Sequence, residues 1–233
     1  MKEFVERLLP LERDLFFALN GSDSMFLDNV MWTLSGRLVW IPMFLVIIFL
    51  FFYKTSRKEA ILVTVFFILV FVLSDQVSSS IFKPLFERFR PTHHPDFMDT
   101  VDIMKGYRGG KYGFISGHAT NSLGLSVFIS LVFKYRWVTI SSLLWATLNS
   151  YTRIYLGVHF IADIIAGMIV GAVLAFILYY IYKTTKRVAF KNVLINGEDI
   201  LYNRKQGKYL AMLVLSYSLI LIIFSPFLST LPH

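Results

Sequence analysis

The chain has 233 residues, of which 56% are hydrophobic, and its mean hydropathy is +0.61. With 23 Phe and 12 Tyr, this composition is too apolar for a soluble domain of such length and indicates an integral membrane protein. The absence of cysteine excludes disulfides, thiolate metal sites and cysteine nucleophiles, and the net charge of +8 requires no nucleic-acid partner.

The first 20 residues predict an amphipathic helix rather than a membrane span or a cleavable signal. Apolar residues recur there at helical spacing between charged residues: Leu8, Leu11, Leu15, Phe16 and Leu19. No short apolar stretch precedes a small-residue cleavage site. We expect this helix to lie in the membrane interface, and we assign residues 1–35 to it and to the segment that leads into the membrane.

Six stretches have lengths near, or somewhat below, the roughly 20 apolar residues that a membrane-crossing helix needs. They cover residues 38–53, 60–82, 117–133, 137–155, 160–182 and 209–228. The first stretch could instead begin near Met25, with Ser35 and Gly36 as a break in a longer helix. The sequence therefore predicts an all-α bundle of six transmembrane helices, with a core at 36–182, a basic cytoplasmic linker at 183–208 and a last helix at 209–233.

Basic residues predict the orientation of this bundle, because Lys and Arg beside transmembrane helices accumulate on the cytoplasmic side. The linkers after the first, third and fifth stretches hold twelve of the 23 Lys and Arg residues but only three of the 15 acidic residues. We therefore expect these linkers in the cytoplasm, against anionic lipid head groups, and both termini outside. This arrangement brings the loop 83–116 and the turn 156–159 together on the outer face.

The outer loop carries positive charge on the side where it is disfavoured, which indicates an anionic ligand. Its basic residues are Lys83, Arg88, Arg90, Lys105, Arg108 and Lys111. Lys83 and Arg90 are seven residues apart, nearly two helical turns, and can point the same way if Pro84 opens a short helix. Taken alone, this pair is better explained as side chains that reach towards water at a helix end.

A second pattern, Gly113-Phe-Ile-Ser-Gly-His118, leads into the third stretch. Glycines before a helix let the backbone approach a ligand, and the first-turn amides with the helix dipole form an anion site. His118 would project onto that site. A histidine that only caps the helix would be the simpler explanation if His118 stood alone.

The third pattern surrounds the turn between the fourth and fifth stretches. His159 and Asp163 are four residues apart, so the carboxylate can hold the imidazole in the tautomer and orientation that a nucleophile requires. A chain reversal near Gly157 would bring Arg153, a bidentate phosphate donor, beside the histidine. An ionisable residue such as Asp163 in an apolar span is costly and therefore indicates function.

Together these patterns resemble the type 2 phosphatidic acid phosphatase superfamily, whose motifs are Lys-x6-Arg-Pro, Pro-Ser-Gly-His and Ser-Arg-x5-His-x3-Asp. Nine fixed positions match in order and spacing: Lys83, Arg90, Pro91, Ser116, Gly117, His118, Arg153, His159 and Asp163. Two positions depart, because Ile115 stands in place of a proline and Thr152 in place of a serine. Neither departure removes a reacting group. The overall texture looks like small bacterial members of the family, some of which dephosphorylate lipid A.

The resemblance implies a metal-independent phosphatase without a cofactor, in the bacterial inner membrane, which hydrolyses a lipid phosphate at the outer face. It implies that His159 attacks phosphorus to form a phosphohistidine, that Asp163 orients it, and that His118 protonates the leaving oxygen and then activates water. It assigns phosphate binding to Lys83, Arg90, Ser116, the Gly117 amide and Arg153. Candidate substrates are lipid A phosphate, undecaprenyl pyrophosphate, phosphatidylglycerol phosphate and phosphatidic acid.

The alternative function is transport or flipping of a phosphorylated lipid or solute, because polar residues among spans can also line a solute path. A haloperoxidase or a phosphatase of soluble substrates would share the three motifs. The position of the site at span ends favours a substrate that diffuses in the membrane. Partners are therefore expected to be membrane lipids and not nucleic acid, and the sequence does not indicate an oligomeric state.

Several other polar residues carry weaker predictions. Asp75 and Gln76 are expected to hydrogen-bond a neighbouring helix, and Asn121 is expected on the same face as His118. A second group suggests a solvated loop rather than a metal site: His93, His94, Asp96 and Asp99. Arg108 and Lys111 are hypothesised to select the head group of the lipid.

Overall fold

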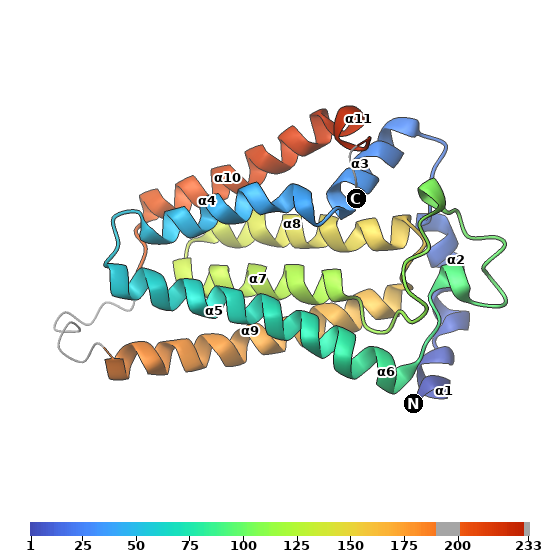
Figure 1. Cartoon of the computed structure of the whole chain (residues 1–233), viewed down its shortest axis with the longest axis horizontal. Coiled ribbons are helices and arrows are strands. Elements are labelled where there is room, and N and C mark those ends of the chain that lie inside the picture. The colour runs from blue at the N-terminus through green and yellow to red at the C-terminus, as the bar shows by residue number, and fades with distance from the viewer. Residues whose placement is uncertain (190–200, 231–233) are drawn as a thin grey trace.

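The computed structural model describes residues 1–189 and 201–230, and every regular element within them is a helix. The long helices run side by side, whereas α1 (Lys2–Glu6) and α2 (Leu9–Leu19) cross one end of the bundle (Figure 1). The prediction of an all-α fold is confirmed. Three of the charged linker residues counted from the sequence lie outside the described residues: Lys191, Glu198 and Asp199. The end of the predicted last helix, 231–233, lies outside them as well.

The remaining elements follow in chain order. The first half contains α3 (Met25–Ser35), η1 (Leu38–Trp40), α4 (Ile41–Phe52), α5 (Arg57–Gln76), the π-helix η2 (Val77–Phe82), α6 (Lys83–Phe86), η3 (Pro91–His93) and η4 (Met104–Gly106). The second half contains α7 (Gly117–Phe133), α8 (Arg136–Tyr155), α9 (Ile161–Ala189), α10 (Arg204–Ile223) and α11 (Ser225–Leu228). The predicted third stretch, 117–133, has the bounds of α7, whereas α9 extends seven residues beyond the predicted end at 182.

Three helical stretches among the described residues are long and apolar enough to cross a membrane: Arg57–Phe86, Ile161–Ala189 and Arg204–Ile223. A fourth arises if α3 and the helical stretch Leu38–Phe52, which are bent by 73° relative to each other, form one broken span. Helix α3 ends at Ser35, so the chain is broken at Ser35 and Gly36 as in the alternative that begins near Met25. The chain is a membrane-embedded helical protein, and large apolar side chains such as Phe49, Phe176 and Leu219 are exposed on its surface, as expected where lipid is the solvent.

Helix α7 is apolar but has only 17 residues, whereas α8 is less apolar because its polar residues face the inside of the bundle. Helix α7 packs against α5, α8 and α9. The Ser126 hydroxyl of α7 donates to the Ser142 carbonyl oxygen of α8 at 2.7 Å, which satisfies the serine inside an apolar environment. Small residues bring α7 and α9 together, since a Cβ on Gly171 would lie 2.2 Å from the Thr120 carbonyl oxygen. Length and hydropathy alone therefore understate the place of α7 and α8 in the bundle.

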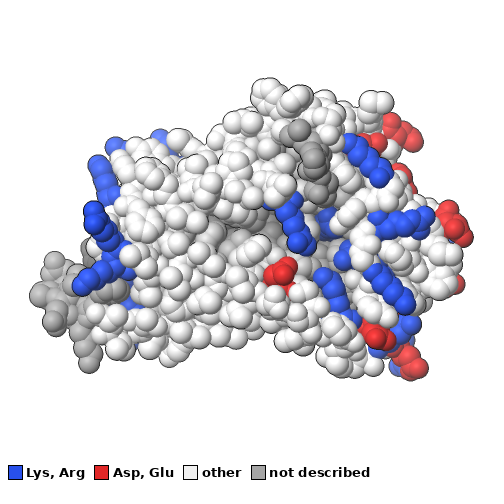
Figure 2. Space-filling model, viewed as in Figure 1, with Lys and Arg blue, Asp and Glu red and all other residues white. Residues whose placement is uncertain are grey.

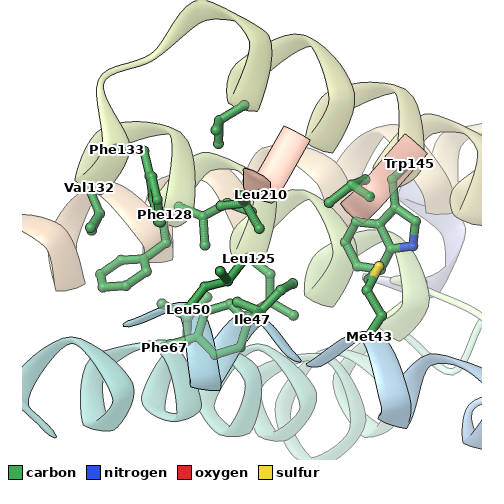
Figure 3. Close-up of a cluster of buried hydrophobic side chains, with 14 of the residues drawn as sticks. Met43, Ile47, Leu50, Phe67, Leu125, Phe128, Val132, Phe133, Trp145 and Leu210 are labelled. Carbon is green, nitrogen blue, oxygen red and sulfur yellow. The ribbon is translucent and has the colours of Figure 1, made fainter. Parts of the chain in front are cut away.

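A cluster of buried apolar side chains holds the bundle together. Figure 3 shows Phe67 of α5, Leu125 and Phe128 of α7, Trp145 of α8 and Leu210 of α10 among the residues that meet there. Some aromatic rings of this cluster pack edge to face: the planes of Trp40 and Trp145 meet at 79°. The cluster fixes the relative position of the helices on which the polar motifs lie.

The N-terminal helix α2 has two different apolar faces. Phe16 is completely buried against the end of the bundle, and Glu12, one turn earlier, is buried on the same face. Leu11 and Leu15 are exposed on the opposite side. Some of the apolar residues that predict an amphipathic helix therefore pack against the bundle, and others are exposed on the outer surface of α2.

The second span ends before the end of the first motif. Helix α6 stops at Phe86, and the next residue, Glu87, has a left-handed φ of 46°. Arg90 lies on an extended segment whose N–H donates to the Lys111 carbonyl oxygen at 3.1 Å. The idea that Lys83 and Arg90 share the face of one short helix is therefore wrong, and the chain brings them together by the turn after Phe86.

Candidate active site

The three motif segments meet at the end of the bundle that α2 crosses. The turn between α8 and α9 is tight, because Gly157 has a φ of +69° and the Val158 N–H donates to the Arg153 carbonyl oxygen at 3.1 Å. The predicted reversal near Gly157 is confirmed. It places His159 two residues before α9 and next to the N-terminus of α7. A hydrogen bond from the Ser116 N–H to the Asp163 carbonyl oxygen, at 3.0 Å, joins the starts of these two helices.

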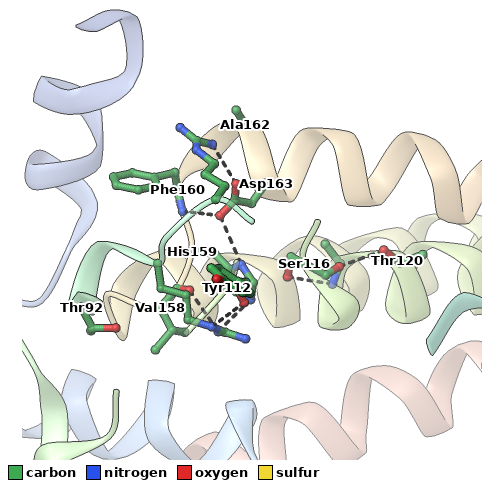
Figure 4. A network of polar contacts seen from close by, with 12 residues as sticks. Thr92, Tyr112, Ser116, Thr120, Val158, His159, Phe160, Ala162 and Asp163 are labelled. Carbon is green, nitrogen blue, oxygen red and sulfur yellow. Dashed lines mark hydrogen bonds and ion pairs between the residues drawn. The ribbon is translucent and has the colours of Figure 1, made fainter. Parts of the chain in front are cut away.

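His159 is buried and has a partner on each ring nitrogen. Its Nδ1 lies 3.3 Å from Asp163 Oδ2, and its Nε2 lies 3.1 Å from Arg90 Nη1 (Figure 4). A guanidinium can only donate, so Nε2 accepts and carries no proton, and the ring proton lies on Nδ1 and is donated to Asp163. The neighbours of His159 thus select one tautomer of the neutral imidazole.

The electrostatic surroundings of His159 are positive. Burial, together with the charges of Arg90, Arg153 and Lys83, lowers the pKa of His159 well below its ordinary value. Burial and the charge of Arg153 also lower the pKa of Arg90, to about 10, so this guanidinium stays charged at neutral pH. The site therefore combines a neutral imidazole with permanent cations at pH 7.

Asp163 has a second set of partners that the sequence did not reveal. Its Oδ2 also accepts the Phe160 N–H at 3.1 Å, and its Oδ1 accepts from Arg88 Nη1 at 2.8 Å. The other end of the Arg88 guanidinium donates to the carboxylate of Glu12 on α2. Burial lowers the pKa of Arg88, but the negative charges of Asp163 and Glu12 outweigh this effect and raise it above its ordinary value. A sequence signal for Glu12 exists, since it lies four residues before Phe16 on an apolar face.

His118, in the first turn of α7, is held by the end of α3. Its Nε2 lies 3.2 Å from the Ser35 carbonyl oxygen, so Nε2 carries a proton and donates it. The Ser35 hydroxyl accepts from Arg153 Nη1. Ser35 therefore connects residues of the second and third motifs, and it belongs to the segment before the predicted first span, where no motif pointed to it.

Arg153 is buried, and its hydrogen bonds within the described part of the chain go to partners other than His159. Besides Ser35 it donates to the Tyr107 hydroxyl at 3.2 Å. The turn brings Arg153 close enough for its charge to act on His159, but its hydrogen bonds are directed towards α3 and the long loop. Arg90, from the first motif, holds the position next to the ring, while the charge of Arg153 still lowers the pKa of His159.

Ser116, Gly117 and Lys83 lie at the start of α7. The Ser116 hydroxyl caps this helix by accepting the Ala119 N–H at 3.4 Å, and Ser116 is buried. A Cβ on Gly117 would lie 3.0 Å from Ser78 Oγ and 4.0 Å from Lys83 Nζ. The lack of a side chain at Gly117 therefore lets the backbone amides at the helix N-terminus approach the lysine ammonium closely.

A cavity of about 510 Å³ opens beside these residues. Its polar part includes Arg37, Asp75, Gly117, His118 and Asn121, and its walls are apolar side chains of α4 and α5 such as Phe44, Phe67 and Phe71. Figure 2 shows that the face over these two helices is hollowed near its centre, with charged residues beside the hollow. The expectation that Asn121 shares the face of His118 is confirmed.

The predicted hydrogen bonds from Asp75 and Gln76 to a neighbouring helix are wrong. Within the described part of the chain, the Asp75 carboxylate makes no hydrogen bond and faces the cavity, where its charge acts on Lys83. The Gln76 side-chain oxygen accepts from Ser80 on its own helix at 3.0 Å. Asp75 therefore faces the cavity, and the Gln76 side chain pairs along its own helix rather than with a neighbouring one.

The loop between the first two motifs is partly anchored. His94 is buried, with Nε2 at 3.4 Å from Glu6 Oε2, so the prediction of a solvated loop is wrong for this residue. Asp96 and Asp99 are exposed.

The structure contains, over residues 1–189 and 201–230, no group of three His, Cys, Asp or Glu side chains placed to hold a metal ion. Arg108 is exposed and donates to the Thr92 carbonyl oxygen at 2.9 Å, which braces the loop.

Comparisons with known proteins agree with the geometry. Residues 64–187 match the family model of the PAP2 superfamily. Two proteins named lipid A 4'-phosphatase are similar to the chain. The one from Porphyromonas gingivalis is 45% identical over 178 residues, which are 76% of this chain and 75% of that protein. The one from Bacteroides thetaiotaomicron is 37% identical over 186 residues, or 79% and 83% of the two chains.

Two more distant proteins extend the comparison. An undecaprenyl-diphosphatase from Sulfolobus acidocaldarius is 29% identical over 182 residues, 77% of this chain and 82% of that protein. The crystal structure of a PAP2-type phosphatidylglycerolphosphate phosphatase from Bacillus subtilis superposes with a TM-score of 0.58 at 25% identity, covering 78% of this chain and 89% of that one. The matched region contains all three motifs and the helices that carry them. The chain therefore belongs to the PAP2 superfamily.

Proposed function

We propose that this protein removes a phosphate group from a lipid in the bacterial inner membrane through a phosphohistidine on His159, and that lipid A 4'-phosphate is the first substrate to test. The chain is a phosphoric ester hydrolase by its family and by the named activities of its relatives. The observation that carries the mechanism is the pair of contacts made by His159, to Asp163 on Nδ1 and to Arg90 on Nε2.

His159 has the features of a nucleophile in phosphoryl transfer. The proton on Nδ1 leaves a lone pair on Nε2, and the lowered pKa of His159 keeps the ring neutral at neutral pH. Arg90 occupies the position in front of Nε2. When a phosphate enters, its oxygens compete for this guanidinium, which then binds a non-bridging oxygen while Nε2 faces phosphorus. Asp163 stabilises the positive charge that develops on the ring.

His118 is suited to act as acid and then base on the leaving group. It is partly exposed and lines the cavity, and its Nε2 proton is engaged with the Ser35 carbonyl oxygen, so Nδ1 is free to exchange a proton. With the anionic phosphate bound, it would carry a second proton on Nδ1 and pass this proton to the leaving oxygen of the lipid. Nδ1 would then accept a proton from the water that hydrolyses the phosphohistidine. Its position beside the cavity gives it access to both.

The phosphate oxygens would be bound by cations and by the start of α7. Lys83, Arg90 and Arg153 supply three positive charges, and Ser116 with the Gly117 amide supplies the helix N-terminus. Phosphoryl transfer depends mainly on positioning and on neutralising charge on the equatorial oxygens. Because these cations can provide that neutralisation, we propose that the reaction proceeds without a metal ion.

The cavity supports a lipid as the substrate. It runs from His118 between α4 and α5, and its walls are largely apolar, which suits an acyl chain or the apolar part of a head group. The phosphate of such a lipid would meet Gly117 and His118 while its tail stays in the membrane. The relatives named lipid A 4'-phosphatase, at 45% and 37% identity, favour lipid A over the other candidates.

We further propose six spans with the site at the outer face. The bent pair α3 and α4, together with α5, α7, α8, α9 and α10, would supply them, and α2 would lie in the interface with Leu11 and Leu15 towards lipid. On the face drawn in Figure 2, one end of the bundle carries Lys and Arg, whereas the end crossed by α2 carries acidic residues as well. This asymmetry supports a cytoplasmic position for the first end.

Phosphate release by the purified protein tests this function. The substrates are lipid A, undecaprenyl pyrophosphate, phosphatidylglycerol phosphate and phosphatidic acid in mixed micelles, each measured with and without a chelator. We expect turnover of at least one lipid, fastest for lipid A, and no effect of the chelator. Absence of turnover across the panel would contradict the lipid substrate, and loss of turnover in chelator would contradict the metal-independent mechanism.

A further inference from the structure

A carboxylate on the N-terminal helix reaches the candidate active site. Glu12 of α2 is only 7% exposed. One of its oxygens is paired with Arg88, 76 residues later, and the other accepts the Ala162 N–H in the first turn of α9 at 2.6 Å. The contacts of Glu12 therefore join the N-terminal helix both to the first motif segment and to the helix that carries Asp163.

Arg88 links this carboxylate to the candidate nucleophile. Its side chain is fully buried, with the guanidinium 4.7 Å from the centre of the Phe160 ring, and it donates to Asp163 Oδ1 at 2.8 Å. Asp163 Oδ2 in turn faces His159 Nδ1 at 3.3 Å. Glu12, Arg88, Asp163 and His159 thus form a continuous chain of charged and polar contacts among buried residues.

Buried ion pairs of this kind contribute little to stability, because desolvation of the charges offsets their attraction. Apolar side chains of similar volume would fill the same space at no electrostatic cost. The arrangement has a clear effect on geometry, however, because Arg88 bridges the two carboxylates: Nη2 is held by Glu12 while Nη1 holds Asp163 Oδ1. Neither Glu12 nor Arg88 contacts the cavity beside His118.

We propose that Glu12 and Arg88 are positioning residues for the phosphatase reaction, and that α2 is for this reason a working part of the active site. The proposal rests on the proposed role of His159 as nucleophile. Glu12 shares the charge of Arg88 with Asp163, so Asp163 keeps enough negative charge to hold the His159 Nδ1 proton. Glu12 also fixes the start of α9 through the Ala162 N–H.

The proposal predicts a change in kcat without a matching change in KM. In Glu12→Gln, Arg88 draws its balancing charge from Asp163 alone, which weakens the hydrogen bond between Asp163 and His159 and makes Nε2 a poorer nucleophile. Substrate binding depends on Lys83, Arg90 and Arg153 and stays the same. Changes to residues that orient an active group typically cost roughly 10- to 100-fold in activity, and we expect a loss of kcat in that range.

The experiment compares Glu12→Gln with Asp14→Asn, which removes an exposed carboxylate from the same helix. For the full chain in micelles, kcat and KM are measured with lipid A and with p-nitrophenyl phosphate, alongside thermal unfolding. We expect the loss of kcat in Glu12→Gln with both substrates and wild-type kinetics in Asp14→Asn. A folded Glu12→Gln with wild-type kcat overturns the proposal, and so does a loss that matches the fraction of unfolded protein.

Two further variants decide the case if Glu12→Gln does not fold. Arg88→Lys keeps the charge but lacks the fork, and Glu12→Asp keeps the charge but shortens the reach, so each should lower kcat with little change in KM. Unchanged kcat in both overturns the proposal. Failure of the proposed function would give different results, whatever Glu12→Gln shows. Turnover of p-nitrophenyl phosphate but of no lipid would contradict the lipid substrate. Full activity of His159→Ala would contradict the role of His159 as the nucleophile.

Discussion

The two histidines of the site are held in different ways. His159 is buried, and successive layers of charged side chains surround it: Asp163 and Arg90 first, then Arg88 and Glu12. His118 is partly exposed beside a cavity and has one backbone carbonyl, that of Ser35, as its partner. A group that forms a bond to phosphorus needs a fixed tautomer and direction, whereas a group that exchanges protons with the leaving oxygen and with water needs access to both.

Replacing His159 tests the buried side of this comparison and should have the largest effect. In His159→Ala no ring nitrogen remains to attack phosphorus, so we expect kcat for phosphate release to fall by about 10⁴-fold or more. The measurement is phosphate release by protein whose folding is verified by thermal unfolding, with a search for phosphohistidine by mass spectrometry. Retained activity would remove His159 as the nucleophile.

Replacing His118 should cost less and should depend on the leaving group. In His118→Ala we expect a loss of roughly 10² to 10⁴-fold with a lipid phosphate, the usual contribution of a general acid or base. The first step should be nearly unaffected with p-nitrophenyl phosphate, because nitrophenolate leaves without a proton. Phosphohistidine should then accumulate, since water is no longer activated. Equal loss in the first step for both substrates would contradict the assignment of His118 as the acid.

The motif spacing predicted part of this site for a physical reason. His159 and Asp163 are four residues apart, so local helical geometry alone brings them together. The contacts of Arg88 and Ser35 could not be predicted in the same way, because each joins segments far apart in the chain, and Ser35 acts on His118 through a backbone carbonyl that any residue possesses. The hydrogen bond of Arg90 to the His159 ring likewise depends on the turn after α6, which joins segments far apart in the chain.

The fold shows the same division between local and tertiary effects. The bounds of α7 and the break at Gly36 follow from capping residues and glycine, which act locally. The number of spans is less accessible from length and hydropathy, because α7 has only 17 residues and α8 buries polar side chains such as Ser142 against α7. The direction of α2 depends on the buried Phe16 and Glu12, whose partners lie in loops and on α9.

The pH dependence should separate the two histidines further. His159 acts in its neutral form, and its lowered pKa keeps it neutral below pH 6.5, so the fall of kcat/KM on the acid side should lie below that value. Lys83→Gln removes one of the positive charges that lower the pKa of His159, so this fall should move upwards, by up to about one pH unit. Lys208→Gln, an exposed change on α10, serves as the control and should leave the profile unchanged.

The smallest effect is expected at Ser35. Ser35→Ala removes the hydroxyl that accepts from Arg153 but keeps the carbonyl that holds His118. The loss of one hydrogen bond to a phosphate-binding arginine is worth about 1 kcal/mol, or roughly a fivefold rise in KM, with kcat mainly retained. Steady-state kinetics with lipid A measure both. A large loss of kcat would mean that the hydroxyl, and not the carbonyl, is what His118 depends on.

The 73° bend between α3 and the following helix determines how members of this superfamily can be recombined. The bend turns the last carbonyl of α3 towards His118, and it precedes the family-matched region, which begins at residue 64. A chimaera joined at that residue inherits both histidines and all three cations from one parent, but the hydrogen-bond acceptor of His118 from the other. Exchange of residues 25–187 as one block keeps this acceptor with the histidine that it holds.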